Sequence, residues 1–325
     1  MQSFDPHELK KLSLPLGNSH KGQNGKLMVI GGSTLFHAAS LWALMIASRL
    51  LDMVFYASVK ENNEIVHELK KEFRNGIVVS RNDMESYLIE ADAVLIGPGM
   101  MRTEKVRVEN GELGVESLEE INALEDEGLQ SYYLTKYLLA KYPEKKWVID
   151  AGALQMMEPE WLKQLNGNVV ITPHAAEFER VFSAVIPNLF RDPKQKDQEM
   201  LKPSKRTSFL EAAPVQNDTV GQIAKEYNCT ILLKGEKDVI CSPETCVEVS
   251  GGNAGMTKGG TGDVLAGLVA ALACKNEVFL AACAGSYLNK QAGESLYKRV
   301  GYYFNSSDLA DEIPRVMNQL LLEKK

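Results

Sequence analysis

A glycine-rich segment, residues 251–267 (GGNAGMTKGGTGDVLAG), carries the strongest chemical signal in this 325-residue chain. Its glycines let the backbone approach a ligand closely, and the segment leads directly into an apolar helical pattern. A helix N-terminus offers free N–H donors and the positive end of the helix dipole, which together favour a phosphate. Asp263 stands at that start as the only carboxylate of the segment. It could act as a general base toward a substrate hydroxyl, or simply cap the helix.

Polar residues also follow three of the apolar runs elsewhere in the chain. His174 comes after Thr172-Pro173, and a lone histidine of this kind is more often structural than functional. Asp150 could help to hold Mg²⁺ through its carboxylate oxygens, or could cap the helix that follows. Lys234 suits a phosphate as a point charge, although a charged hairpin turn explains it as well.

The elements that must position these residues alternate along the chain, short apolar runs followed by longer helical ones. Several of the runs are rich in Val and Ile, as in strands that are covered on both faces. This alternation predicts an α/β fold with a central, mostly parallel sheet flanked by helices on both faces. The predicted strands are Lys26–Ile30, Met53–Ser58, Gly76–Val79, Ala93–Ile96, Lys146–Ile149, Asn168–Ile171, Thr230–Leu233 and Asp238–Cys241. The predicted helices are Ala38–Leu51, Ser131–Lys141, Gly221–Tyr227, two between Asp263 and about Lys298, and a short one over Pro6–Leu12.

Two segments depart from this alternation. Residues 103–128 are acidic and low in large apolar residues, which predicts a surface loop with short helical pieces. Residues 187–217 are rich in charge and proline, so they cannot form a core strand, and they are expected to be a decorative insertion, an active-site lid or a subunit contact. No shift in composition marks a second domain, and residues 1–325 are therefore expected to fold as a single domain.

Composition excludes several classes of protein. With a net charge of −7, 45% hydrophobic and 24% charged residues, the chain reads as an ordinary globular protein, and its acidity disfavours nucleic-acid binding. Five cysteines without a CxxC pair make a disulfide framework unexpected and favour a reducing, cytoplasmic location. The N-terminus has no apolar core of a secretory signal, and the longest apolar stretch is broken by Arg49 and Asp52, so no membrane span is expected.

Taken together, the motifs resemble those of the ADP/ATP-dependent NAD(P)H-hydrate dehydratases, a family of the ribokinase-like superfamily. The resemblance begins with the glycine-rich segment, where NAGM is followed by GGTGDVLAG. Five further elements occur in the family's order: KG…GGS (residues 21–33, with Phe36 and Ala39), GPG (97–99), a DADAL-like strand end (150–154), TPHxxEF (172–178) and KGxxT-like Lys234-Gly235. The six matches span residues 21–267, which is most of the chain.

The resemblance implies a ribokinase-like fold and a role for each matched position. Asp263 would be the catalytic base. The hydrated nicotinamide nucleotide, NAD(P)HX, would be bound by Ala39, Gly99, His174 and Asp263. The adenine nucleotide would be bound by Lys234, Gly235, Glu236, Lys237, Asp238, Asn253, Gly259, Gly260, Thr261 and Gly262. Mg²⁺ would bridge the nucleotide phosphates, and no motif identifies its ligands.

The implied reaction is the dehydration of (6S)-NADHX or (6S)-NADPHX to NADH or NADPH, with ADP or ATP as the phosphoryl donor. With ADP, the preferred donor by analogy with stand-alone prokaryotic members, the products are AMP and phosphate. Asp263 would take the proton of the C6 hydroxyl as that oxygen attacks the terminal phosphoryl group, and the backbone N–H groups of residues 259–262 would stabilise the developing charge. A separate NAD(P)HX epimerase is the expected functional partner, since too few residues precede Lys21 for a fused one, and the family's habit suggests a homo-oligomer.

Four departures from the family pattern leave alternatives open. The positions are Ala38, Met100, Gly152 and Asp238, the last of which would add negative charge near an anionic ligand. A small-molecule kinase of the same superfamily is one alternative; thiazole and pyrimidine kinases usually carry Cys in place of Asp263, and sugar kinases usually lack the NxGM and TPHxxEF elements. A nucleotide-binding sensor without turnover is the other alternative, and it would bind ADP without consuming it.

Overall fold

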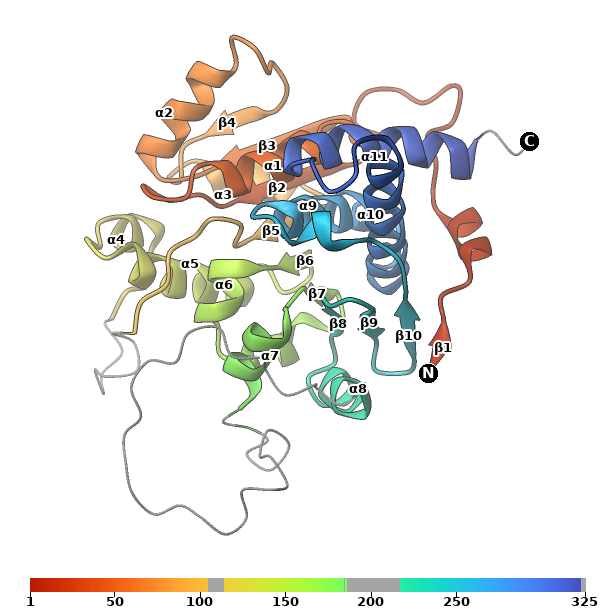
Figure 1. Ribbon diagram of the computed structural model, residues 1–325. Coiled ribbons are helices and arrows are strands. Elements are labelled where there is room, and N and C mark those ends of the chain that lie inside the picture. Colours follow the sequence, from red (N-terminus) through yellow and green to blue (C-terminus); the bar gives the residue numbers. More distant parts are fainter. Residues whose placement is uncertain (105–113, 184, 186–216, 323–325) are drawn as a thin grey trace.

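A single mixed sheet of ten strands runs through the protein, and helices cover both of its faces (Figure 1). The computed structural model describes residues 1–104, 114–183, 185 and 217–322. The strands are β1 (Gln2–Ser3), β2 (Lys26–Ile30), β3 (Met53–Ala57), β4 (Ile77–Val79), β5 (Ala93–Ile96), β6 (Lys146–Ile149), β7 (Val169–Ile171), β8 (Thr230–Leu233), β9 (Asp238–Cys241) and β10 (Cys246–Val249).

The strand order in the sheet is β1-β10-β9-β8-β7-β6-β5-β2-β3-β4. All neighbours from β4 to β8 are parallel, whereas β9 is antiparallel to both β8 and β10. The order reverses between β2 and β5, and the loops after the parallel strands therefore gather at one edge of the sheet. In open α/β sheets this carboxyl edge is where ligands bind.

The helices alternate with the parallel strands and then form a C-terminal group. Those described are α1 (Ala38–Ala47), α2 (Lys60–Leu69), α3 (Met84–Glu90), α4 (Leu118–Asn122), α5 (Glu127–Lys141), α6 (Ala151–Met156), α7 (Ala175–Phe182), α8 (Asn217–Glu226), α9 (Thr261–Ala273), α10 (Val278–Val300) and α11 (Ser306–Leu321). Short 3₁₀ helices span Pro6–Lys11, Pro159–Leu165 and Ala254–Thr257. None of the helices within the described ranges is long and apolar enough to cross a membrane.

The two faces of the sheet each build a hydrophobic core. Along β2, Met28 and Ile30 pack into one core, while Leu27 and Val29 pack into the other. This alternation follows from the period of two in a strand, and it explains why the strand sequences are apolar throughout. The first core lies against α3 to α8, and the second against α1, α9 and α10, with α11 packed outside α9 and α10 (Figure 1).

The predicted fold class is confirmed, and most predicted strands agree with the structure to within one residue. The predicted helices exist as well, although α1 ends earlier and α5 begins earlier than expected. None of the predicted strand and helix ranges corresponds to β1, β10, α2, α3, α6, α7 or α11. Residues 103–128 contain α4 and the start of α5, and part of this segment lies outside the described residues. The charged segment 187–217 also lies outside them, except that Asn217 begins α8.

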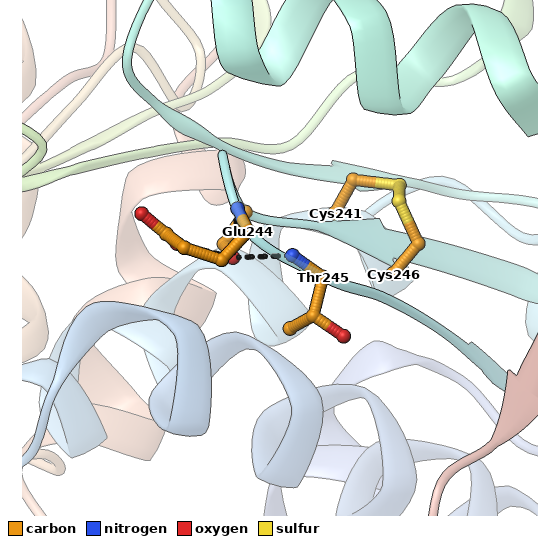
Figure 2. Close-up of a disulfide and its surroundings, with 5 residues drawn as sticks. Cys241, Glu244, Thr245 and Cys246 are labelled. Carbon is orange, nitrogen blue, oxygen red and sulfur yellow. Dashed lines mark hydrogen bonds between the residues drawn. A yellow bond between two sulfur atoms is a disulfide. The ribbon is translucent and has the colours of Figure 1, made fainter.

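A disulfide joins Cys241 and Cys246, which corrects the expectation that no disulfide would form (Figure 2). The two cysteines face each other at the last pair of the β9–β10 ladder, with their Cα atoms 4.1 Å apart. The sequence did not indicate this pairing, since the cysteines show no CxxC spacing and are odd in number. The tight turn between β9 and β10 is what brings the two cysteines together. The remaining cysteines, Cys229, Cys274 and Cys283, are buried thiols.

Candidate active site

Two glycine turns meet at the point where the strand order reverses. The turn after β2 donates a hydrogen bond from Gly32 N to Pro98 O of the turn after β5 (2.7 Å). Gly99 has φ +75°, and a Cβ on it would lie 3.2 Å from the Cβ of Ala39 and 2.8 Å from Phe36 O. Only glycine fits this close approach with that backbone conformation. The structure therefore brings Ala39 and Gly99, both predicted to bind the hydrate, into direct neighbourhood.

A buried carboxylate and a lysine form the centre of the sheet edge. Asp150, the N-cap of α6 at the end of β6, is 2% exposed. Its Oδ1 accepts hydrogen bonds from Thr172 Oγ1 (2.7 Å) and from Lys234 Nζ (3.0 Å). Lys234 follows β8, and its backbone N–H donates to Pro173 O (2.8 Å). A buried charge of this kind is stable only when it is paired, so each residue holds the other in place.

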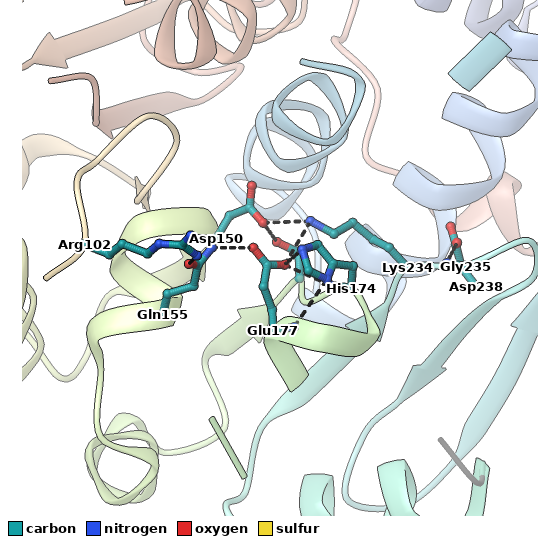
Figure 3. A network of polar contacts seen from close by, with 9 residues as sticks. Arg102, Asp150, Gln155, His174, Glu177, Lys234, Gly235 and Asp238 are labelled. Carbon is teal, nitrogen blue, oxygen red and sulfur yellow. Dashed lines mark hydrogen bonds and ion pairs between the residues drawn. The ribbon is translucent and has the colours of Figure 1, made fainter. Parts of the chain in front are cut away.

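Glu177 and His174 extend this cluster across α7 (Figure 3). His174 is the N-cap of α7, where Glu177 N donates to its Nδ1 and Glu177 Oε2 accepts from its backbone N–H. The same Oε2 lies 3.8 Å from Lys234 Nζ, and Glu177 Oε1 accepts from Gln155 Nε2 (2.9 Å). The His174 side chain is 54% exposed, so it can still reach a ligand at the sheet edge.

Asp263 lies in the first turn of α9, and its environment suits a base. Burial raises the pKa of its carboxyl from 3.8 to about 7, and the charge of Asp150 adds to this effect while Lys234 opposes it. For Lys234, burial alone would lower the pKa, but the charges of Asp150 and Glu177 outweigh it and hold the pKa above 10.5. The site thus pairs a permanent ammonium with a carboxylate that titrates near neutral pH, as general base catalysis requires.

Backbone contacts fix the loop that precedes Asp263. Gly260 is the N-cap of α9 in the left-handed region, at φ +96°. Thr261 Oγ1 donates to Met256 O (2.6 Å) and Lys258 O (2.9 Å), and Ser306 Oγ of α11 donates to Gly259 O (2.8 Å). At the start of α9, the N–H of Thr261 donates to Lys258 O (3.3 Å), whereas the N–H of Gly262 has no acceptor in the described part of the chain and is available to a ligand. A Cβ at Gly262 would lie 3.6 Å from Lys234 Nζ, so the start of α9 and the Lys234 ammonium border the same space.

A cavity of about 550 Å³ adjoins this helix start. Its lining includes seven of the residues predicted to bind the nucleotide: Lys234, Gly235, Glu236, Asp238, Asn253, Thr261 and Gly262. Gly259, Gly260 and Lys237 do not line it, and Lys237 instead pairs with Glu248 on β10 (2.8 Å). Most of the predicted nucleotide residues therefore gather at one cavity, although they come from segments about 20 residues apart.

Asp238 does not leave an uncompensated negative charge in this cavity, contrary to the expectation from its sequence. Lys290 Nζ of α10 lies 3.3 Å from Asp238 Oδ1, and both side chains are buried. Asp238 Oδ1 also accepts from Gly235 N (2.9 Å), and Oδ2 accepts from Ser286 Oγ (2.7 Å). With its oxygens engaged in this way, Asp238 stabilises the β8–β9 turn.

Two other departures from the family pattern fit each other. A Cβ on Gly152 would lie 2.1 Å from Met100 O, and Met100 itself is buried. Because the backbone of Met100, after β5, lies so close to residue 152, only glycine fits there. The departures at Met100 and Gly152 are thus one local rearrangement beside Asp150.

The acidic side chains of the site decide whether it can hold Mg²⁺. No set of three or more His, Cys, Asp or Glu side chains in the described ranges is arranged to hold a metal ion. Mg²⁺ usually keeps several waters and takes one or two carboxylates together with substrate phosphates. Asp150, a buried carboxylate at the sheet edge, fits a Mg²⁺ that is carried in by nucleotide phosphates.

Sequence reasoning missed the contribution of α10 to this cavity. Asn289 and Lys290 line it, and Glu294 Oε1 accepts from Gly252 N of the glycine-rich loop (3.2 Å). A signal was present: α10 carries one set of small and polar residues that follow the 3.6-residue period, namely Ser286, Asn289, Lys290, Gly293 and Glu294. Sequence reasoning also assigned no role to Glu177, which it named only as part of the TPHxxEF motif.

The fold and the site together define the class of protein. A mostly parallel sheet, with a glycine-rich helix start and a buried carboxylate beside a cavity at its carboxyl edge, is an arrangement suited to binding the phosphates of a nucleotide. A family model described as NAD(P)H-hydrate dehydratase matches residues 27–315. The chain belongs to this family.

Relatives and solved structures agree with this assignment. The chain is 34% identical over 303 residues to the ADP-dependent (S)-NAD(P)H-hydrate dehydratase of Nitrosopumilus maritimus, covering 92% of this chain and 90% of that one. It is 32% identical to the bifunctional NAD(P)H-hydrate repair enzyme Nnr of Methanocaldococcus jannaschii, covering 95% of this chain but 51% of that one. The chain therefore spans about half the length of such bifunctional relatives.

Among solved structures, the ADP/ATP-dependent NAD(P)H-hydrate dehydratase of Bacillus subtilis, co-crystallised with ATP/Mg²⁺, has a TM-score of 0.70 at 20% identity. The match covers 98% of each chain. A ribokinase-like superfamily protein of Enterococcus faecalis has a TM-score of 0.72 at 19% identity, covering 98% of this chain and 96% of that one. At these identities the likeness concerns the fold.

Proposed function

We propose that the protein repairs damaged nicotinamide nucleotides, dehydrating (6S)-NAD(P)HX to NAD(P)H with ADP as the phosphoryl donor. The observation that carries this proposal is the raised pKa of the Asp263 carboxyl at the start of α9, beside the Lys234 ammonium and a cavity lined by predicted nucleotide residues. The name of the Nitrosopumilus relative supports the reaction and its dependence on ADP, and the name of the Methanocaldococcus relative supports a role in NAD(P)H-hydrate repair.

In the proposed reaction, the hydrate lies over Ala39 and Gly99 with its C6 hydroxyl toward Asp263. The Asp263 carboxylate takes the hydroxyl proton as the oxygen attacks the terminal phosphoryl group of ADP, and AMP leaves. The C6–O bond of the resulting phosphate ester then breaks with the help of the ring nitrogen's electrons. Loss of the C5 proton restores the reduced nicotinamide, so that NADHX and ADP yield NADH, AMP, phosphate and one proton.

The remaining residues of the site bind and orient. Lys234 and the backbone N–H groups at the start of α9 stabilise the charge that develops on the phosphoryl oxygens. His174 binds the hydrate at the exposed end of the cluster. Bound Mg²⁺ would neutralise phosphate charge, and Asp150 is the side chain that would hold it, directly or through water.

We propose one domain for residues 1–325, as the sequence predicts, and a homo-oligomeric assembly, as the resemblance to the family implies. We also propose a cytoplasmic location, although the Cys241–Cys246 disulfide removes the argument for it from the cysteines. A separate NAD(P)HX epimerase is the proposed functional partner, and the bifunctional repair enzymes among the relatives support this pairing.

The test is recovery of NADH from chemically prepared NADHX, followed by the absorbance of the reduced nicotinamide, with ADP, ATP or no nucleotide. Recovery that needs added nucleotide, with AMP formed in the ADP reaction, is the expected result. ADP binding without recovery would overturn the proposal. In that case, consumption of the nucleotide with another alcohol would indicate a kinase, and its persistence with every alcohol would indicate a sensor.

A further inference from the structure

A second polar cavity lies at the β4 end of the sheet (Figure 1). Its volume is about 620 Å³, and its lining comes from the segments that follow β2, β3 and β4 and from α2 and α5. These three strands are parallel, so the cavity lies at the same carboxyl edge of the sheet as the glycine turns. None of the residues assigned to the proposed reaction lines it.

This cavity adjoins the turns that are proposed to bind the hydrate. A Cβ on Gly99 would lie 3.2 Å from Gly32 Cα, and a Cβ on Gly32 would lie 2.6 Å from Ser58 Oγ. Ser58 lines the cavity, and so does Thr34, two residues beyond Gly32. A ligand that starts over Gly99 therefore reaches the cavity by crossing the turn at Gly32.

Arg81, which follows β4, is a buried cation in the wall of this cavity. The residue is 9% exposed, and its only hydrogen bond within the described residues runs from Nη1 to Gln130 Oε1 (2.7 Å). Nε is fully enclosed without a partner, whereas Nη2 also lacks a partner but keeps accessible surface, so it can donate to a ligand in the cavity. Burial lowers the pKa of Arg81 to about 10, which leaves the group charged at neutral pH. A buried charge with so few acceptors costs stability until an anion pairs with it.

The other charged residues of the lining suit the uncharged parts of a ligand. Glu61, Glu64 and Glu125 line the cavity at exposed positions, where carboxylates can accept hydrogen bonds from sugar hydroxyls. Glu127 accepts from Thr34 N (3.2 Å) and Thr34 Oγ1 (2.5 Å), and its charge partly offsets the burial of Arg81. A free anion would be repelled by these carboxylates, whereas a phosphate attached to a ribose matches both the cation and the acceptors.

The width of the sheet indicates which phosphate reaches Arg81. Only β3 lies between β2 and β4, so the ends of these two strands are about 10 Å apart. In NAD(P)HX the diphosphate is one ribose away from the hydrated ring, whereas the 2′-phosphate of NADPHX lies beyond a second ribose. A hydrated ring over Gly99 therefore places the diphosphate, and not the 2′-phosphate, near the end of β4.

We propose that Arg81 binds the diphosphate of the hydrated dinucleotide, with Nη2 donating to a phosphoryl oxygen and the exposed glutamates accepting from ribose hydroxyls. The inference rests on the proposed function and deepens it: the cavity at β4 receives the substrate, and the cavity at α9 receives ADP. Arg81 then serves NADHX and NADPHX alike, since both carry the diphosphate.

The test is the binding of NADH and NADPH, measured by titration calorimetry without the hydrate. Arg81→Met is expected to weaken both affinities by about 10- to 100-fold, as the loss of one hydrogen bond to a charged group implies, and to leave the affinity for ADP unchanged. Arg81→Lys keeps the charge but not the planar group, so its affinities should fall between those of the wild type and Arg81→Met. Arg74→Met, at an exposed position before β4 and outside the cavity lining, is the matched control and should change no affinity.

A purely structural role for Arg81 predicts different results. Because the guanidinium has few acceptors in the ligand-free protein, Arg81→Met should unfold at the same temperature as the wild type or a higher one. Unchanged NADH affinity in this variant, a loss confined to NADPH, or an equal loss for ADP would overturn the inference, as would a wild-type protein that binds neither dinucleotide. A protein that binds NADH through Arg81 but recovers none from NADHX would instead contradict the proposed function.

Discussion

Asp263 is the proposed catalytic base, and its environment makes this role measurable. Only the ionised carboxylate can accept the hydroxyl proton, and burial raises the pKa of this group to about 7. The rate of hydrate turnover at low substrate should therefore fall by up to tenfold per pH unit below about 7 and level off above it. Asp263→Asn should bind ADP normally while losing about 10²- to 10⁴-fold in turnover. Near-normal turnover in this variant would contradict the role of base.

The same substitution should stabilise the fold at high pH. The unfolded Asp263 ionises near 3.8, whereas the folded one keeps its proton up to about 7. Rising pH between these values favours the unfolded wild-type chain, and the full cost is present above the folded pKa. Asp263→Asn removes it, so the variant should be about 1–4 kcal/mol more stable at pH 8 and equally stable below pH 3.8. Denaturant melts at several pH values measure this gap; a gap that stays constant with pH would argue against a raised pKa.

At the residue scale, prediction from sequence succeeded where a residue's neighbours are close in the chain. Asp263 could be identified because its helix start and glycines are adjacent to it. The role of Asp238 could not be predicted, because its ion-pair partner Lys290 lies 52 residues further along the chain, on α10. The unpaired donors of Arg81 were equally hidden, since only packing shows which buried polar groups lack a partner.

At the scale of elements, the loop before α9 depends on Gly260, which is enclosed by side chains of α1 and α11. At Gly260, φ is +96° and a Cβ would lie 2.2 Å from Trp42 Cζ3 of α1 and 2.6 Å from Ser306 Oγ. Gly260→Ala should therefore cost about 1–3 kcal/mol or more of stability and weaken ADP binding. Gly259→Ala is the matched control, because no heavy atom lies within 4 Å of its Cβ position and its stability should change by less than about 0.5 kcal/mol. Thermal melts of the two variants test this; equal losses would show that the loop is not held by α1 and α11.

The β9–β10 hairpin gives a second prediction at this scale. The Cys241–Cys246 disulfide closes a turn of four residues, Ser242 to Thr245, in which Ser242 Oγ accepts from the backbone N–H groups of Glu244 and Thr245 (Figure 2). Closing so short a loop is worth about 2 kcal/mol in the unfolded chain. Reduction should lower the thermal midpoint of the wild-type protein but not that of a Cys241→Ser/Cys246→Ser variant. Thiol titration in denaturant should find three free thiols before reduction and five after it; five thiols before reduction would contradict the disulfide.

Elements were predictable to the extent that their pattern is local. The buried parallel strands are apolar runs with clear ends, which explains the agreement at β2, β5, β6 and β8. By contrast, β10 (Cys246–Val249) carries a glutamate and is only partly buried, so its sequence lacks that signal. Its place in the sheet comes from pairing with β9 and β1, a tertiary effect that no local pattern contains.

At the scale of the whole molecule, the site joins distant parts of the chain. The proposed hydrate side includes Ala39 and Gly99 from turns before residue 100, and the proposed nucleotide side comes from residues after 233. The helices behind them pack directly: a Cβ on Gly267 of α9 would lie 2.6 Å from Ala43 Cα of α1. Residues of β2, β3 and α9 also share one hydrophobic core. The two sides of the site therefore pack on one shared core, as a single folding unit requires.

This coupling predicts how the protein responds to nucleotide. A ligand that binds only the folded state stabilises it by about 2.7 kcal/mol at a free concentration 100-fold above its Kd. Because both halves of the site share one core, saturating ADP should raise the temperature of a single calorimetric transition without splitting it. The matched control is Gly260→Ala, whose weaker ADP binding should reduce the shift at the same ADP concentration while leaving one transition. Two transitions, with only one moved by ADP, would show instead that the nucleotide side folds as a unit of its own and that the hydrate turns belong to another.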